Sequence, residues 1–593
     1  MRRLGAPSSR RHAAPLWLAV ACLAALLYQT AGGLKMGRAQ IQSIEELMAS
    51  MSLREKVGQM VMTGIEGFEP GIDARTLIGE HKVGGVILFS RNIQSATQTA
   101  GLINRLQAMA VDQGGVPLLV AVDQEGGTVM RVPDATLVPG NMALGAARDA
   151  GLAYRVGLRI GEELRAMGFN VNFAPVLDVN NNPQNPVIGV RSFGEEPELV
   201  TELGLAMIRG LQEAGVLATA KHFPGHGDTA VDSHIDLPAV PHDRARLDQV
   251  ELAPFRAAIE NGVAGIMSAH VTFPAIDPTP GLPATLSKPV LTGLLREELG
   301  FEGLIFTDAM EMGAITSRYG IGRAAVMAVL AGADVVLVGW PSDWRMALEV
   351  VTALQEAAES GVIPEERIDA SVARILAAKK RLGLFDAHQV APASVAARVG
   401  GEKGDALALE AARKSVTLVK DEKGLVPLST RRLLVVTPQV RGLTGIDNPG
   451  ATETALGMAL AGQGFEVEEV TVSLNPDLGE RRAVVEKAQR AEVVLLGTYN
   501  AWQSRHAGQA QLARELLARG VDVIAVALRD PYDYAQMPEI PAYLATYGLT
   551  PPQLQALAEV LAGRTSPQGR LPISIPEHFP AGSGITGQKP PQL

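Results

Sequence analysis

The chain of 593 residues contains a single cysteine, Cys22, so it can form neither an internal disulfide framework nor a zinc site made of several cysteines. Aromatic residues make up only 4%, and the net charge is −10. Nucleic-acid-binding proteins are normally basic and often stack bases on aromatic rings, so we expect no nucleic-acid partner. With 47% hydrophobic and 20% charged residues, the chain is instead typical of a globular protein of two or three domains, stabilised by packing.

Residues 1–44 contain no aspartate or glutamate. Four arginines precede an apolar run, Ala13–Tyr28, and small residues follow it. This pattern predicts a signal peptide or N-terminal anchor over residues 1–33. The run would span about 24 Å as a helix, less than the roughly 30 Å of a bilayer core, which favours a cleaved signal. Ala19–Ala21 before Cys22 leaves a lipidated N-terminus open as well.

No other stretch is long and apolar enough to span a membrane, so contact with a membrane is expected only through this segment. We therefore expect the protein to act outside the cytoplasm, secreted or held at the cell surface.

Between residues 44 and 385, eight short apolar runs alternate with helical patterns such as Leu247–Asn261 and Pro289–Leu299. In most runs the apolar residues are continuous, as in strands buried on both faces. Eight strand–helix units predict a (β/α)8 TIM-type barrel rather than an open, doubly wound sheet. The runs are Val57–Ile65, Gly84–Phe89, Pro117–Val122, Phe169–Leu177, Val216–Ala220, Ala264–Ser268, Gly303–Thr307 and Ala333–Val338.

A predicted linker, 386–404, separates this barrel from a second alternating block, 405–581. The second block predicts a smaller α/β sandwich domain. Residues 582–593 are rich in Gly, Pro and Gln and are expected to be loose. The apolar runs of the second block are Ser415–Val419, Leu433–Pro438, Glu466–Val472, Ala491–Gly497, Val521–Leu528 and Ala542–Tyr547.

Polar residues follow five of the eight barrel runs directly or after one residue, at positions where packing in a strand core does not favour a charged side chain. Active sites of such barrels lie at the carboxyl ends of the strands, so this placement predicts the site. The residues are Asp123, Asp178, the pair Lys221 and His222, His270 and Asp308.

The segment Lys221–His234 holds three of the ten histidines and two aspartates, and its proline and glycines predict a loop. Three interpretations are open. The loop could simply be solvated, or His222, His226 and His234 could bind a metal together with an aspartate. Alternatively, Asp232 could hold His234 as an acid/base pair, because a carboxylate fixes the tautomer of an imidazole and stabilises its charged form.

Asp308 is the natural partner of such an acid. A carboxylate at the end of a barrel strand can attack a sugar carbon as a nucleophile. Asp308 also precedes a possible helix, where aspartate is a favoured N-cap. Spacing alone does not decide between these two roles.

Several motifs resemble glycoside hydrolase family 3, in its β-N-acetylglucosaminidase branch. The most specific is the segment 221–238, with Lys-His-Phe-Pro-Gly-His-Gly followed by Asp-Ser-His and Asp-Leu-Pro. The resemblance covers the barrel in order and reaches the second block at Leu561–Pro572. Further matches are Asp123–Gly127, Arg131, Arg191–Gly194 and Thr307–Ala309.

The resemblance implies an exo-acting β-N-acetylhexosaminidase that retains the anomeric configuration. Asp308 would be the nucleophile, His234 the acid/base and Asp232 the residue that orients it. The terminal sugar would be bound by Asp123, Arg131, Arg191, Lys221 and His222. His226 would brace the loop, and Asp178 and His270 would belong to the wall of the site.

The resemblance implies no metal and no organic cofactor, and a carbohydrate as the partner, plausibly cell-wall muropeptides. We take a monomer as the default. A β-glucosidase or β-xylosidase of the same family, a GlcNAc phosphorylase and a sugar-binding protein without turnover remain alternatives.

Overall fold

The computed structural model describes residues 43–339, 343–440 and 455–587. The chain divides into two units, Met1–Ser50 and Met51–Leu593. In the first unit, Ile44–Ser50 forms helix α2, and the signal or anchor predicted for residues 1–33 lies outside the described residues. Within the described ranges, no helix combines the length and the apolar character needed to cross a membrane.

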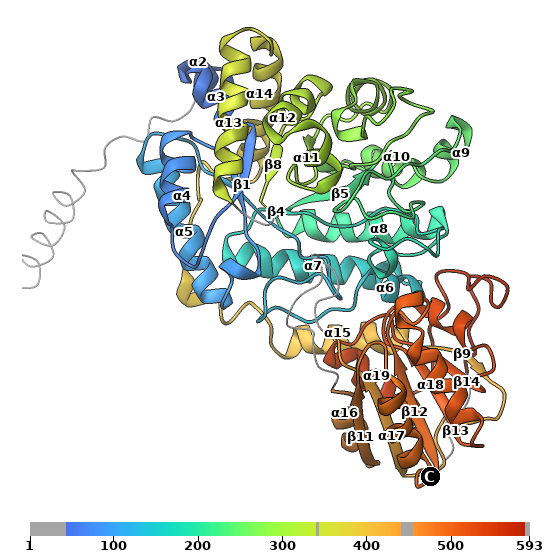
Figure 1. Ribbon diagram of the computed structural model, residues 1–593. Helices are drawn as coiled ribbons and strands as arrows, with labels where there is room; N and C mark the ends of the chain where they lie inside the picture. The colour runs from blue at the N-terminus through green and yellow to red at the C-terminus, as the bar shows by residue number, and fades with distance from the viewer. Residues whose placement is uncertain (1–42, 340–342, 441–454, 588–593) are drawn as a thin grey trace, which may run out of the picture. The chain divides into compact units, whose positions relative to one another are not determined.

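The first block of the second unit forms an eight-stranded parallel barrel, which confirms the predicted fold class (Figure 1). The strands are ordered β7-β6-β5-β4-β3-β2-β1-β8, and a parallel bridge between Phe306 and Val335 joins the two ends of the sheet. Each apolar run contains or overlaps one strand. The strands are β1 (Val61–Gly64), β2 (Gly85–Ile87), β3 (Leu119–Val122), β4 (Val171–Asn172), β5 (Leu217–Phe223), β6 (Gly265–Ser268), β7 (Leu304–Phe306) and β8 (Val336–Val338).

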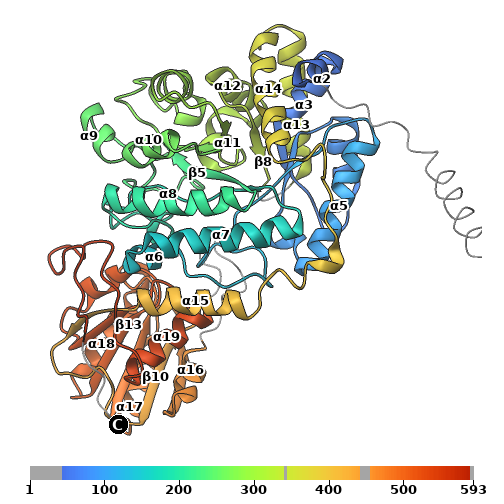
Figure 2. The same ribbon diagram turned by 180° about the vertical axis from the view of Figure 1, so that it is seen from behind.

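Helices cover the outside of the barrel, and α7 and α8 lie side by side in both views (Figures 1 and 2). Their close approach needs Gly157, because a Cβ there would lie 2.5 Å from the carbonyl oxygen of Met207. The barrel helices are α3 (Leu53–Gln59), α4 (Ile72–Ala74), α5 (Ala96–Asp112), α6 (Asn141–Ala147), α7 (Ala150–Met167), α8 (Pro197–Glu213), α9 (Arg244–Gln249), α10 (Ala253–Glu260), α11 (Gly313–Tyr319), α12 (Ile321–Ala331), α13 (Trp344–Glu359) and α14 (Glu365–Arg381), with π-helices at Arg75–Glu80 and Pro289–Glu298.

Two predicted elements differ from the structure. The expected helix Leu247–Asn261 is two helices, α9 and α10, because Pro254 starts a new helix where its missing N–H costs nothing. The first residues of the run Val57–Ile65 are helical. A capping box between Ser52 and Glu55 starts α3, which continues to Gln59 before β1 begins.

The second block forms a six-stranded sheet ordered β11-β10-β12-β13-β14-β9, in which only β9 is antiparallel to its neighbour. It occupies the orange and red part of Figure 1. Helix α15 (Glu402–Ser415) leads into it. The strands are β9 (Thr417–Asp421), β10 (Arg432–Pro438), β11 (Glu466–Val472), β12 (Val493–Thr498), β13 (Asp522–Ala527) and β14 (Ala542–Ala545).

Alternate residues of these strands enter two separate cores, one on each face of the sheet. Leu433 and Val435 of β10 pack on the face covered by α16 (Leu456–Gly462) and α19 (Pro551–Leu561). Leu434 and Val436 pack on the face covered by α17 (Leu478–Ala488) and α18 (Gly508–Leu517). The domain is therefore the predicted α/β sandwich, with helices on both faces of one sheet.

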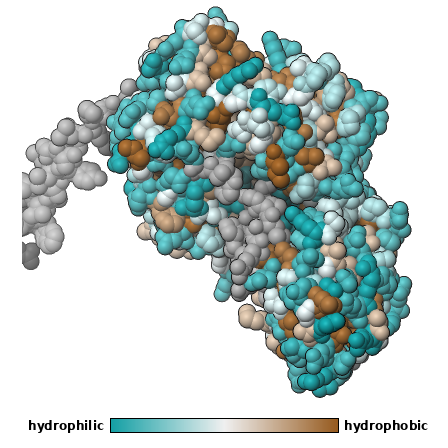
Figure 3. All heavy atoms as spheres, in the orientation of Figure 1, coloured by the Kyte–Doolittle hydropathy of each residue, from teal (hydrophilic) through white to brown (hydrophobic). Residues whose placement is uncertain are grey.

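On the face of the molecule in Figure 3, apolar residues are scattered among hydrophilic ones singly or in small groups. The solvent-facing surface on this side is thus that of an ordinary globular protein.

Candidate active site

The odd-numbered strands bring three of the predicted site residues to the carboxyl end of the barrel. Asp123 follows β3 directly, Lys221 lies in β5, and Asp308 comes two residues after β7. Lys221 and His222 were expected after the fifth strand, but β5 continues to Phe223. The reason is its pairing with β6, in which Lys221 lies opposite Met267 and Phe223 opposite Ser268.

Glu125 is the centre of the charged cluster, and sequence reasoning did not assign it to the site. Its carboxylate accepts bonds from Arg191 at 2.8 and 3.0 Å and pairs with the Nζ of Lys221 at 2.7 Å. Lys221 also reaches Asp123 at 2.9 Å. The available signal was the Asp-Gln-Glu-Gly-Gly motif, in which two acids lie two residues apart at the end of a strand.

Glu125, Arg191 and Lys221 are charged despite their burial. Burial alone would raise the pKa of Glu125, but the Arg191 and Lys221 cations hold it well below its usual range. Burial would lower the pKa of Arg191 and of Lys221, yet the neighbouring carboxylates raise both. The cluster therefore presents fixed cations and carboxylate oxygens, which suits the recognition of sugar hydroxyls.

His222 is held by Asp178, whose carboxylate bonds the His222 Nδ1 at 2.7 Å and the His222 backbone N–H at 3.1 Å. Asp178 also accepts the backbone N–H of His226 at 2.7 Å. Burial disfavours the charged form of Asp178, but the two imidazoles lower its pKa. One buried carboxylate thus fixes the ring of His222 and the start of the loop that follows β5.

Asp308 does not cap a helix. The next helix, α11, begins at Gly313, with Met312 in the N-cap position. Although burial disfavours a charged carboxylate, the imidazoles of His222, His270 and His234 lower the pKa of Asp308 to about 2. The side chain is therefore an ionised carboxylate at neutral pH, the form that a nucleophile needs.

His234 and Asp232 form a hydrogen-bonded pair in the loop. The Nδ1 of His234 lies 2.7 Å from the Asp232 Oδ1, which also accepts the His234 backbone N–H at 2.9 Å. Burial alone would raise the pKa of Asp232, but the bond to His234 outweighs this effect. The net pKa is lowered, so the carboxylate is ionised. With Nδ1 engaged, the Nε2 of His234 is the ring nitrogen left to exchange a proton with a substrate.

His226 and His270 brace the structure around the site. The ring of His226 bonds the hydroxyls of Thr229 and Ser233, both at 2.9 Å, and burial lowers its pKa to about 4. His270 bonds Thr285 and the carbonyl oxygen of Ala309, next to Asp308, and burial lowers its pKa as well. The ring of His226 is therefore a neutral support at neutral pH, and His270 holds the backbone beside Asp308.

One pocket joins these residues. Its polar lining comprises Asp123, Glu125, Arg131, Arg191, Lys221, His222, His234 and Asp308. Asp232, the remaining predicted site residue, is not among the lining residues but bonds His234, which is. Four apolar lining residues, Ile87, Phe173, Met267 and Leu337, come from or directly follow the four even-numbered strands, as expected for one packed layer of a barrel. All described lining residues belong to the barrel.

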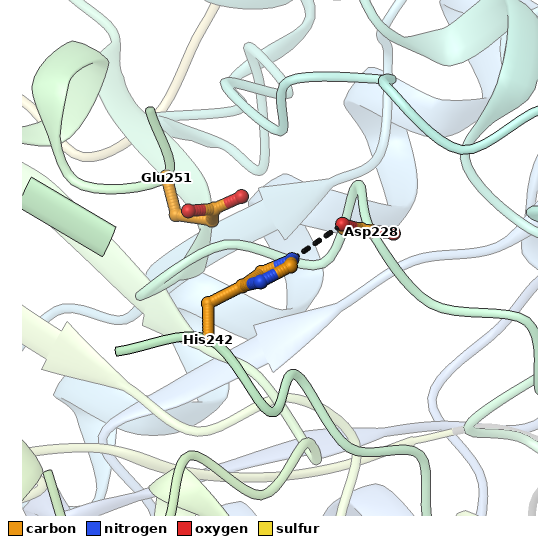
Figure 4. A group of neighbouring side chains, drawn as sticks. All are labelled: Asp228, His242 and Glu251. Atoms are coloured by element: carbon orange, nitrogen blue, oxygen red, sulfur yellow. Dashed lines mark hydrogen bonds and ion pairs between the residues drawn. The ribbon is translucent and has the colours of Figure 1, made fainter. Parts of the chain in front are cut away.

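The geometry does not favour the metal interpretation of the three loop histidines. His222, His226 and His234 bond Asp178, two hydroxyls and Asp232, respectively. Within the described ranges, another group brings three potential ligand atoms within 4.8 Å of one another, namely Asp228, His242 and Glu251 (Figure 4). There the Arg246 guanidinium already balances Glu251, with two contacts at 2.7 and 2.9 Å.

A (β/α)8 barrel whose pocket combines an ionised aspartate, a second group able to donate a proton and a cluster of fixed charges can cleave a glycosidic bond. The family models agree. The Glycosyl hydrolase family 3 N terminal domain matches residues 52–378, and the Glycosyl hydrolase family 3 C-terminal domain matches residues 416–584. The chain therefore belongs to glycosyl hydrolase family 3.

Three relatives span nearly the whole chain. Beta-hexosaminidase A of Pseudoalteromonas piscicida is 32% identical over 84% of this chain and 90% of its own. Beta-N-acetylglucosaminidase/beta-glucosidase of Cellulomonas fimi is 30% identical over 89% of this chain and 95% of its own. The solved structure of a glycoside hydrolase family 3 beta-N-acetylglucosaminidase from Paenibacillus sp. str. FPU-7 is 45% identical, covering 89% of this chain and 99% of that one, with a TM-score of 0.84.

Proposed function

We propose that the protein is an exo-acting β-N-acetylhexosaminidase, which hydrolyses terminal β-linked N-acetylglucosamine with retention of configuration. The observation that carries the proposal is the pairing of ionised Asp308 with the Asp232–His234 pair in one charged pocket. Three relatives whose names include hexosaminidase or N-acetylglucosaminidase activity support the choice of sugar.

In the first step, an Asp308 oxygen attacks the anomeric carbon while the glycosidic C–O bond breaks. The Nε2–H of His234 gives its proton to the leaving oxygen, and the Asp232 carboxylate stabilises the imidazolium before transfer. The product is a glycosyl ester of Asp308.

In the second step, neutral His234 takes a proton from water, and the water oxygen attacks the same carbon. The bond to Asp308 breaks, and the sugar leaves with the starting configuration. An imidazole in place of the usual acid carboxylate repels an incoming anion less, so phosphate is a second acceptor to be tested.

The fixed charges would hold the terminal sugar. Arg191 and Lys221 cannot turn freely, because Glu125 binds both of them. Together with Asp123, Arg131 and His222, they offer oriented donors and acceptors to hydroxyl groups on several sides of a ring.

We further propose that the enzyme works outside the cytoplasm, on muropeptides or other soluble glycans of the cell wall. This rests on the signal-like composition of residues 1–33. Fractionation of cells that produce the full chain, followed by N-terminal sequencing of the mature protein, tests it. Recovery of the intact N-terminus in the cytoplasm would refute it.

The activity is tested with 4-nitrophenyl β-N-acetylglucosaminide beside the matching glucoside and xyloside, each with and without phosphate. We expect release of GlcNAc, with much slower turnover of the other two sugars. Release of GlcNAc-1-phosphate would make the enzyme a phosphorylase, and a preference for the glucoside or xyloside would refute the proposed sugar. Binding of the sugar without turnover would refute the proposed catalysis.

A further inference from the structure

We infer that two anchors outside the pocket, Asn185 and the Asp228–His242 pair, are positioning residues for His234. The inference rests on the proposed role of His234 as the acid/base. Both anchors act on the catalytic loop, defined here as residues 224–234, which carries the Asp232–His234 pair after β5 ends. Neither anchor lines the pocket.

Asn185 lies under the first half of the catalytic loop and is 4% exposed. Its Nδ2 donates to the carbonyl oxygens of His226 and Gly227, both at 2.9 Å, and lies 3.2 Å from the Thr229 hydroxyl. A single side-chain amide thus pairs with two buried loop carbonyls, of which that of His226 also accepts the Thr229 hydroxyl at 3.2 Å. Such carbonyls are costly to leave unpaired, so Asn185 holds the loop in one conformation.

The same asparagine is bonded to the segment that carries Arg191. Its Oδ1 accepts the backbone N–H groups of Val187 at 3.0 Å and Ile188 at 2.8 Å. The backbone N–H of Arg191 in turn bonds the Ile188 carbonyl at 2.9 Å. One buried side chain therefore fixes both the sugar-binding arginine and the loop of the acid/base, and sets the distance between them.

The second anchor holds the middle of the loop. The Nε2 of His242 lies 2.7 Å from an oxygen of Asp228, and Glu251 lies beside this pair (Figure 4). Glu251 is 2% exposed and packs against the loop at Gly225, where a Cβ would lie 2.8 Å from the Glu251 Cβ. The anchor connects the loop to the segment before α9 and to the turn between α9 and α10.

The second half of the loop depends on its first half, because the ring of His226 bonds the Ser233 hydroxyl at 2.9 Å. Two bonds from the start of α11 reach it, from Gly313 to the His234 carbonyl at 3.1 Å and from Ala314 to the Ser233 carbonyl at 3.3 Å. Val231, beside Asp232, is 42% exposed. A displacement of about 1 Å at a proton donor can cost roughly 100-fold in rate, so loss of an anchor should weaken proton donation.

The test compares wild type with Asn185→Ser and His242→Ala on two aryl β-N-acetylglucosaminides. The 2,4-dinitrophenyl group leaves without a proton, whereas the 4-methoxyphenyl group needs one from His234. In both variants we expect the loss of kcat/KM to be about tenfold larger on the methoxyphenyl substrate. His242→Gln, which keeps an N–H at a similar reach from Asp228, should recover most of this difference.

Asn104→Ser is the matched control. Asn104 also bridges the backbone, with bonds of 2.8 and 2.9 Å to Val390, but it lies outside the pocket lining and the catalytic loop. This variant should leave the ratio of kcat/KM between the two substrates at the wild-type value, even if it changes the melting temperature.

Equal losses on both substrates would overturn the inference, and so would a His242→Gln variant as impaired as His242→Ala. If Asn185→Ser does not fold, the half-exposed His242 carries the test. If wild type prefers glucosides, the ratio of kcat/KM between the two leaving groups is measured on the corresponding aryl glucosides. A wrong proposal about the sugar is thereby distinguished from a wrong inference about the anchors. A wild-type protein without any turnover would refute both proposals.

Discussion

Glu125→Gln is the substitution for which the structure makes the sharpest energetic prediction. The change keeps the shape of the side chain but removes the charge that Arg191 and Lys221 share. In the variant, the side-chain amide oxygen can still accept one hydrogen bond. The amide NH2 group, however, faces an N–H of one of the two cations, and both of these groups are donors. Removing one partner of a buried ion pair costs about 3 to 5 kcal/mol. Because Lys221 keeps Asp123 at 2.9 Å, we expect the lower end of that range.

The assay is unfolding in urea, monitored by circular dichroism, with Glu69→Gln as the control. Glu69 also pairs with an arginine, Arg105, at 2.8 Å, but the two side chains are 70% and 45% exposed. Exposed pairs contribute about 0 to 1 kcal/mol, so the control should barely change the free energy of unfolding. Glu125→Gln combined with Arg191→Met should cost less than the sum of the two single changes. Equal effects of Glu125→Gln and Glu69→Gln would refute the reasoning.

Three further predictions concern catalysis and pH. Asp308→Ala should lower kcat/KM by at least about 1000-fold without changing the circular dichroism spectrum, and substantial residual turnover would reassign the nucleophile. His234→Ala should lower kcat/KM by roughly 100-fold or more on a natural disaccharide but far less on the 2,4-dinitrophenyl glycoside, and equal losses would contradict its role as the acid. Burial raises the pKa of Asp533 from 3.8 to about 7. The folded protein holds this proton to a higher pH than the unfolded chain. The resulting contribution to the free energy of unfolding, roughly 4 kcal/mol, is fully present below about pH 4 and is lost as pH rises through 7. Melting temperatures measured across pH should therefore show Asp533→Asn more stable than wild type above pH 7; an unchanged difference between pH 5 and pH 8 would contradict the shift.

The barrel and the sandwich could be predicted because both depend on local patterns. Continuous apolar runs such as Ala264–Ser268 mark strands covered on both faces, and each run contains or overlaps a strand. Element boundaries were less predictable. Pro254 divides a helix that the spacing of apolar residues alone makes continuous, and β5 extends to Phe223 because β6, distant in sequence, pairs with it.

The sequence by itself determined the two domains, the family and the chemical types in the site, because the Asp-x-His motif and the aspartate after the seventh strand are local in the chain. Only the tertiary structure excluded the helix-cap role of Asp308, since α11 starts at Gly313. Only it revealed Glu125 as the shared partner of two cations, and Asn185 as the link between Arg191 and the catalytic loop. These contacts join residues up to about a hundred positions apart, and the closure of the barrel, which local patterning does not specify, brings them together.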